Sequence, residues 1–239
     1  MTETVHIDIV SDVMCPWCFI GKKRFEKALG AIGEDVAVEV NWRPFQLDPT
    51  LPQEGKDRDQ YLAEKFGSIE RARELYRNVE NAGAGEGIPF RFEAIAVSPN
   101  TLDAHRLIRW AQTAGEGVQT RVVEALFELY FLKGGNIGDQ AVLLDVAREA
   151  GMDTAIVESL LASDADPEAI TQEIALAQQM GVTGVPCFIL ENKYAVMGAQ
   201  DPETIADAIR QVAARKAAAS EAASAGDTGR RGMSVACTA

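Results

Sequence analysis

Two cysteines, Cys15 and Cys18, are separated by two residues and follow directly behind a short apolar run at residues 5–10. That run has β-branched and apolar residues at alternate positions, which predicts a strand. Pro16 suits the first turn of a helix, because no N–H is needed there and its fixed φ is already helical. Residues 19–29 continue with apolar side chains at helical spacing and charged residues between them. The sequence therefore predicts a pair of thiols at a strand-to-helix turn.

Such a turn favours thiol chemistry. The first backbone N–H groups of the helix are unpaired, and the positive end of its dipole faces the sulfur of Cys15. A thiolate is the reactive form of cysteine, and helix N-termini and CxxC motifs lower the thiol pKa to about 3.5–7.5. By position, we expect Cys15 to be the exposed attacking thiol. Cys18, one turn into the helix, is expected to be the buried resolving partner.

Two other interpretations of the cysteine pair are half of a zinc site and a pair of packed core residues. A structural zinc site of this type needs a second CxxC or HxxxH pair. The remaining cysteines and histidines are scattered: His6, His105, Cys187 and Cys237. The spacing favours a redox dithiol and predicts no metal site.

Composition limits the partners of the chain. Its 239 residues carry a net charge of −13, which argues against binding to nucleic acid or to an anionic membrane. No apolar stretch approaches the length of a membrane span, and the first residues lack the basic and apolar regions of a secretory signal. We expect a cytoplasmic protein. A reducing cytosol disfavours a structural disulfide between Cys15 and Cys18 and suits a catalytic one.

The order of predicted elements indicates an α/β unit that is interrupted by helices. We expect residues 1–52 and 166–216 to form the two parts of this unit, residues 53–165 a helical insertion, and residues 217–239 an Ala/Ser/Gly-rich flexible tail. Caps are expected at Asp139 and Asp166. The predicted strands are residues 5–10, 36–42, 187–190 and 194–197, and the predicted helices are residues 58–82 (interrupted near 67–68), 100–114, 117–131, 139–149, 154–161, 167–180 and 202–216.

A second motif, residues 181–186, ends in Val185-Pro186 at the entrance to an apolar strand. Proline cannot donate to a strand ladder, so it requires an edge or a special turn. A cis Val185–Pro186 bond would leave the Val185 backbone free to pair with an extended peptide. An ordinary turn proline is the alternative. Because the chain also carries the CxxC pair, we interpret this motif as part of a substrate groove.

The chain resembles the thioredoxin superfamily, and within it the DsbA-like oxidoreductases of the FrnE type. These are relatives of the 2-hydroxychromene-2-carboxylate isomerases and the kappa-class glutathione transferases. The resemblance covers roughly residues 5–213. It rests on four segments in order: Ser11-Asp12-Val13-Met14-Cys15-Pro16-Trp17-Cys18, Trp42-Arg43-Pro44-Phe45, residues 98–107, and residues 181–186 with Gly198-Ala199-Gln200.

The resemblance implies a thioredoxin fold with a large all-helical insertion domain, of the α/β class. It also implies that Cys15 and Cys18 are catalytic and that a cis Pro186 faces them. Substrate contacts are expected from Pro16, Trp17, Val185 and Pro186. No cofactor is expected, although glutathione would serve as a thiol substrate.

The chain departs from its relatives near the thiols. Many thioredoxin-like proteins have a buried carboxylate where this chain has Ile9. Asp12 is closer to the thiols in sequence and either caps the turn or accepts a proton. Lys22 and Lys23 are expected to be solvated. Reduction potentials of about −120 to −270 mV occur in such proteins, so the direction of electron flow stays open.

Three further residues have two interpretations each. Cys187 is either a small buried side chain or a third redox thiol beside the groove. Cys237 lies in the tail and is either incidental or able to visit the dithiol. His105 is either a structural histidine paired with Asp103 or a backbone carbonyl, or a polar group that faces substrate.

The leading function hypothesis is thiol–disulfide exchange with a disulfide- or thiol-containing protein or a small thiol. A glutathione-dependent isomerase or transferase is the second hypothesis, but those relatives usually have a serine in place of the dithiol. A redox-gated, chaperone-like binding module is the third. The sequence does not predict an oligomeric state.

Overall fold

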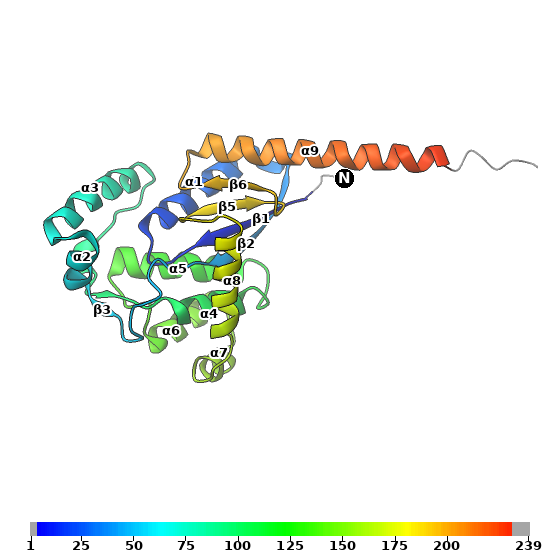
Figure 1. Ribbon diagram of the computed structural model, residues 1–239. Helices are drawn as coiled ribbons and strands as arrows, with labels where there is room; N and C mark the ends of the chain where they lie inside the picture. Colours follow the sequence, from blue (N-terminus) through cyan, green and yellow to red (C-terminus); the bar gives the residue numbers. More distant parts are fainter. Residues whose placement is uncertain (1–3, 231–239) are drawn as a thin grey trace, which may run out of the picture.

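The computed structural model describes residues 4–230, with side chains described through residue 221. Its centre is a four-stranded sheet in the order β2-β1-β5-β6 (Figure 1). The strand β1 (Thr4–Ser11) pairs parallel with β2 (Ala37–Pro44) and antiparallel with β5 (Cys187–Leu190). The edge strand β6 (Tyr194–Met197) pairs antiparallel with β5. The predicted strands are therefore confirmed.

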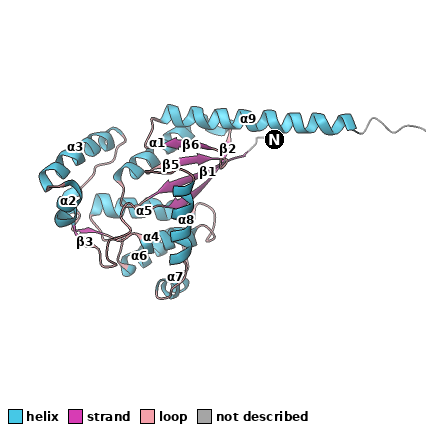
Figure 2. Ribbon diagram, in the orientation of Figure 1, coloured by secondary structure: helices cyan, strands magenta, loops and turns pink. Residues whose placement is uncertain are grey.

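Both faces of the sheet are covered because β1 and β5 carry apolar side chains on each side. On one face, Ile7, Ile9 and Phe188 join a large core with the helices α1 (Pro16–Ile32) and α9 (Pro202–Arg230). On the other face, Val10 and Cys187 pack with Ala177 and Val182 around the end of α8 (Pro167–Gln179). Figure 2 shows the sheet with helices on both sides. This is a thioredoxin fold with a helical insertion.

The insertion follows β2 and precedes α8. Its helices are α2 (Arg58–Phe66), α3 (Ile69–Gly85), α4 (Leu102–Ala111), α5 (Val118–Lys133), α6 (Gln140–Ala150) and α7 (Thr154–Leu161). The expectation of an all-helical insertion is wrong in one detail, because β3 (Lys56–Asp57) and β4 (Val97–Ser98) form a short antiparallel ladder. Runs of two residues carry no hydrophobic period, so the sequence pattern does not indicate them. The domain borders near residues 53 and 165 stay predictions.

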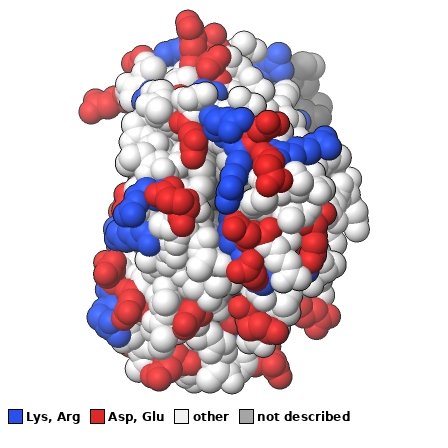
Figure 3. All heavy atoms as spheres, turned by 90° about the vertical axis from the view of Figure 1, so that its left-hand side faces the viewer, with Lys and Arg blue, Asp and Glu red and all other residues white. Residues whose placement is uncertain are grey.

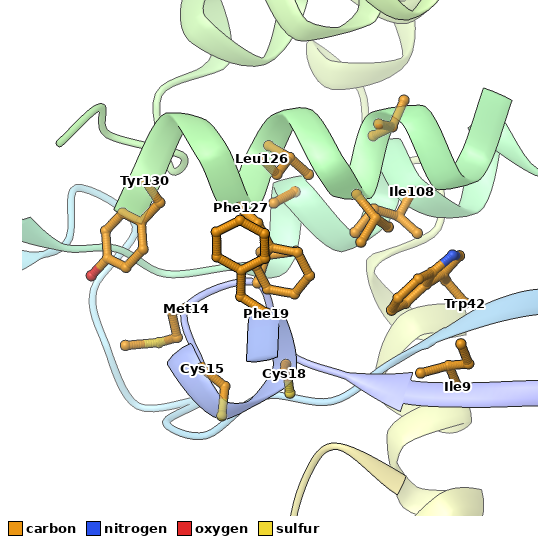
Figure 4. Packing of buried hydrophobic residues seen from close by; sticks show 14 of the residues in the cluster. Ile9, Met14, Cys15, Cys18, Phe19, Trp42, Ile108, Leu126, Phe127 and Tyr130 are labelled. Carbon is orange, nitrogen blue, oxygen red and sulfur yellow. The ribbon is translucent and has the colours of Figure 1, made fainter. Parts of the chain in front are cut away.

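Aromatic side chains pack the insertion against the first turns of α1. The rings of Phe19 and Phe127 stack at a centroid distance of 5.1 Å (Figure 4). The Phe131 ring also stacks with Phe19, at a centroid distance of 6.2 Å. All three are 1% exposed or less. Burial of a large aromatic side chain contributes about 1.5–3 kcal/mol, so this contact holds α5 firmly against the helix that begins at the dithiol.

The expectation that Lys22 is solvated is wrong. Lys22 is 2% exposed, because α5 covers that side of α1, and its ammonium pairs with Glu26 and Glu124. Burial lowers the pKa of Lys22 from its usual value, although Glu26 acts in the opposite direction. Lys23 remains partly exposed and also reaches Glu124, at 2.5 Å. These ion pairs join α1 to α5 beside the aromatic contact.

Two boundary expectations are also corrected. The Asp139 side chain caps α6 as predicted, but Asp166 adopts φ 66° and does not cap α8; its carboxylate instead accepts a hydrogen bond from Trp110 Nε1 at 2.7 Å. The last helix, α9, continues to Arg230 rather than ending near residue 216. Cys237 lies outside the described residues.

Within the described residues, no helix is long and apolar enough to cross a membrane.

Candidate active site

The two cysteines lie at the junction of β1 and α1. Cys15 occupies the N-cap of α1 with an extended backbone, and Pro16 follows as the first helical residue. The Cys15 N–H donates to the Asp12 carbonyl at 2.9 Å, and the Cys18 N–H donates to the Cys15 carbonyl at 3.0 Å. The turn predicted from the sequence is therefore present. It directs the N-terminal end of α1 at the first thiol.

Cys15 is more enclosed than expected, whereas Cys18 is buried as predicted. Cys15 is 5% exposed and Cys18 is 1% exposed, so the expectation of an exposed Cys15 is wrong. The loop that contains Val185 covers it: the Cys15 sulfur lies 3.9 Å from the Val185 carbonyl oxygen. In Figure 4 both cysteines point away from the stacked Phe19 and Phe127 rings. Trp17, between them in sequence, is the exposed member of the motif at 39%.

The pKa of the Cys18 thiol is raised well above its usual value. Burial is the main cause, followed by the hydrogen bond with the Cys15 thiol and the charge of Cys15. The Ser11 hydroxyl and an Asp12 backbone hydrogen bond act in the opposite direction. Ser11 is buried, and its Oγ has no hydrogen-bond partner in the described part of the chain. Cys18 is thus a protonated thiol at neutral pH, with Ser11 available to stabilise its thiolate.

The Val185–Pro186 peptide bond is cis, as expected from the second motif. The Pro186 ring packs directly on α1: a Cβ added to Gly21 would lie 2.7 Å from Pro186 Cγ. The Pro186 carbonyl accepts a hydrogen bond from Gly198 N–H at 2.8 Å, which ties the loop to the end of β6. Among the described residues, no acceptor is found for the Val185 N–H. The proline and the dithiol therefore face each other, with an unused backbone donor beside them.

Asp12 and His105 form a second, buried pair behind the dithiol. Asp12 is 0% exposed, and its carboxylate accepts from Met14 N–H at 3.3 Å and from Leu47 N–H at 2.7 Å. His105 Nε2 lies 3.4 Å from Asp12 Oδ1. The expected partners of His105, Asp103 or a backbone carbonyl, are therefore wrong. Asp12 lies far away in sequence, so no local pattern could indicate the pair.

Cys187 has the features of a buried core residue. It is 0% exposed and lies opposite Val10 and Met197 in the sheet. Burial raises the pKa of its thiol to about 11. A thiol in this state is a poor nucleophile at neutral pH. Among the described residues, no group of three or more His, Cys, Asp and Glu side chains could hold a metal ion.

This arrangement of a CxxC helix start, a facing cis proline and an inserted helical block has a known counterpart. Residues 6–210 match the family model described as the DSBA-like thioredoxin domain. The chain belongs to this family. The DsbA-like resemblance found in the sequence motifs is thereby confirmed.

Individual relatives agree with this assignment. The uncharacterized protein YwbO of Bacillus subtilis (strain 168) is 31% identical over 194 residues, which cover 78% of this chain and 87% of that protein. A crystal structure described as the probable DsbA oxidoreductase SCO1869 from Streptomyces coelicolor is 33% identical, with a TM-score of 0.79 over 87% of this chain and 89% of that one. The structure of a 2-hydroxychromene-2-carboxylate isomerase shares the fold at 15% identity, with a TM-score of 0.64 over 89% of this chain and 98% of that one.

Proposed function

We propose that this protein is a thiol–disulfide oxidoreductase in which Cys15 and Cys18 exchange electrons with the disulfide of a protein or a small thiol. The observation that carries the proposal is the position of Cys15. It lies at the N-cap of α1, its sulfur is 3.9 Å from the Val185 carbonyl oxygen, and a second thiol follows one turn later. A nucleophilic thiol, a resolving thiol and a facing backbone segment are the three parts that the exchange requires.

The electrons and protons of the proposed exchange balance without a cofactor. In the reducing direction, the Cys15 thiolate attacks one sulfur of the substrate disulfide, and the other substrate sulfur leaves as a thiolate that takes up a proton. Cys18 then loses its proton and attacks the Cys15 sulfur. The second substrate thiol is released, and a Cys15–Cys18 disulfide remains. Two electrons have passed from the dithiol to the substrate, and the oxidising direction is the reverse.

The surface beside the dithiol favours a peptide or protein substrate. Trp17 and Leu47 are large apolar side chains that are 39% and 38% exposed, and Leu47 is tied to Asp12 behind the thiols. Exposed apolar side chains around a reactive group suit contact with the apolar residues of a partner. The free Val185 N–H would pair with an extended segment of that partner, in the manner of strand addition. Trp17, Pro16, Val185 and Pro186 are accordingly our proposed substrate contacts.

The structural likeness to a 2-hydroxychromene-2-carboxylate isomerase supports a second candidate, a glutathione-dependent isomerase or transferase. Such an enzyme would activate the glutathione sulfur without a protein disulfide, so it would not need both Cys15 and Cys18. A chaperone-like module would likewise keep its client binding after loss of Cys18. Retention of two thiols one turn apart favours the oxidoreductase.

Turnover assays separate these candidates. The reduction of insulin disulfides by dithiothreitol, and the oxidative refolding of a reduced protein in a glutathione buffer, should be measured for the wild type and for Cys15→Ser. Cys187→Ala is the matched control, because it also removes a buried thiol. We expect Cys15→Ser to lose both activities and Cys187→Ala to retain them. Wild-type rates in Cys15→Ser would refute the proposed function.

A further inference from the structure

A cavity of about 520 Å³ lies between α2, α3 and the residues that precede β4. Its walls include Leu62, Ile69, Tyr76, Phe92 and Ile95. None of its lining residues belongs to the CxxC turn or to the cis-proline loop. Small-molecule sites in proteins typically have volumes of about 300–1,000 Å³ and mostly apolar walls with a few polar groups. This cavity has a volume in that range, its lining combines six apolar or aromatic residues with seven charged ones, and it is separate from the dithiol.

The buried charged residue of its lining is Arg58, the first residue of α2, which is only 5% exposed. Its Nη1 donates to the Tyr130 hydroxyl at 3.0 Å, and its guanidinium lies 5.2 Å from the Tyr76 ring centre and 5.9 Å from that of Tyr130. Its Nε has no hydrogen-bond partner among the described residues. Within the same part of the chain, no carboxylate forms an ion pair with Arg58.

A buried cation without an anion is costly, because it has lost its water and gained no charged partner. The phenol and the ring faces around Arg58 offset only part of that cost, since they carry dipoles and quadrupoles rather than a full negative charge. A guanidinium also has more donors than Tyr130 uses, and its planar fork matches a carboxylate in geometry. The wall of the cavity thus supplies a site that one anionic group would complete.

Basic and acidic residues both lie at the rim, where Arg73 and Arg77 are 66% and 65% exposed. Asp59 and Glu93 are 71% and 72% exposed there, and Asp57 caps α2 by accepting from Gln60 N–H. Figure 3 shows the side of the molecule that carries α2 and α3, where acidic and basic side chains are interspersed without a large basic patch. A rim of mixed charge does not concentrate polyanions, so the buried guanidinium of Arg58 is the group that selects a single negative charge.

We infer that this cavity binds a small organic monocarboxylate with a compact apolar body, with Arg58 pairing with the carboxylate and the apolar walls enclosing the rest. The buried guanidinium without an ion pair and the cavity whose lining includes Arg58 and a group of apolar side chains carry this inference together. It does not depend on the direction or substrate of thiol exchange, because the cavity shares no residue with the thiol site.

Calorimetric titration of the wild-type protein with 3-phenylpropanoate and with the neutral 3-phenylpropanamide tests the inference. We expect the acid to bind at least about tenfold more tightly than the amide, which corresponds to one charge-assisted hydrogen bond. Alkylation of Cys15 with iodoacetamide should leave both affinities unchanged. No binding of the acid, equal binding of acid and amide, or loss of binding after alkylation would each overturn the inference.

Arg58→Gln should abolish the preference for the acid, whereas Arg91→Gln should retain it. Arg91 is the matched control because it is a nearby arginine that is 62% exposed and does not line the cavity. A preference that persists in Arg58→Gln would contradict the inference. If that variant does not fold, Ile69→Trp provides a second test, because the larger ring would fill the cavity from a half-buried position. Unchanged binding of the acid by Ile69→Trp would also overturn it.

Discussion

The Asp12 carboxylate links the loop after β2 to the CxxC turn, because one of its oxygens accepts from Met14 N–H and the other accepts from Leu47 N–H. His105 Nε2 lies 3.4 Å from the same carboxylate. Asp12→Ala should leave both N–H groups unpaired. Each unpaired buried group costs about 1–3 kcal/mol, so we expect the free energy of unfolding to fall by about 2–6 kcal/mol. Asp12→Asn should lose less, because its amide oxygen retains one acceptor. Urea unfolding measures both values, and a fully stable Asp12→Ala would refute this role.

Ser11 influences the pKa of the Cys18 thiol. Its hydroxyl lowers the pKa of Cys18 against the larger effect of burial, so Ser11→Ala should raise that pKa further. The mixed disulfide would then resolve several-fold more slowly at neutral pH, and the pH dependence of resolution would shift to higher pH. Stopped-flow measurement of resolution across pH tests this expectation.

Ser98→Ala is the control for Ser11→Ala. Ser98 is also fully buried, and its Oγ also has no hydrogen-bond partner among the described residues, but it lies on β4 beside Tyr130. We expect its resolution profile to match the wild type. Equal profiles for the Ser11 and Ser98 variants would show that Ser11 has no part in the chemistry.

Gly21 allows Pro186 to approach the dithiol helix. A Cβ at this position would lie 2.7 Å from Pro186 Cγ, so Gly21→Ala must displace the cis-proline loop. We expect a stability loss of about 1–3 kcal/mol, as for other overpacked sites, together with a large loss of turnover. Gly30→Ala, on the same helix and with no atom within 4 Å of its added Cβ, should instead gain about 0.5–1 kcal/mol. Similar behaviour of the two variants would contradict this account.

Cys187 gives a measurable dependence of stability on pH. Burial raises the pKa of its thiol to about 11, whereas an unfolded cysteine ionises near its usual value of 9.0. Between these values the unfolded state loses a proton that the folded state keeps, so the stability contribution of Cys187 is present below pH 9.0 and is lost as the pH rises towards 11. We expect the stability difference between the wild type and Cys187→Ala to shrink by about 1–3 kcal/mol over this range. A constant difference would refute the burial argument.

The local elements were predictable from the sequence, because each has a local physical cause. Gly67 adopts φ 88° at the end of α2 and Ser68 caps α3, which is why the predicted break between the two helices is present. The α9 prediction failed beyond residue 216 because the alanine-rich composition there was interpreted as a flexible tail. Alanine is in fact the strongest helix former.

Three tertiary relationships were not predictable. Lys22 has the sequence position of a solvated helix residue, and only the packing of α5 on α1 buries it with Glu124. The pair of Asp12 and His105 requires α4 to be placed behind the dithiol. The burial of Cys15 depends on the Val185 loop. The cytoplasmic location and the absence of nucleic-acid and membrane partners stay predictions, and both interpretations of Cys237 stay open.

The most direct test of the proposed function is to isolate the mixed disulfide. Cys18→Ser retains the attacking Cys15 but lacks the resolving thiol, so a substrate disulfide should remain joined to the protein. We expect mass spectrometry of Cys18→Ser, after incubation with a disulfide-containing peptide, to show a stoichiometric adduct on Cys15 that dithiothreitol releases. Cys15→Ser should form no adduct under the same conditions. Absence of the adduct in Cys18→Ser, or an adduct on Cys187 instead, would contradict the account.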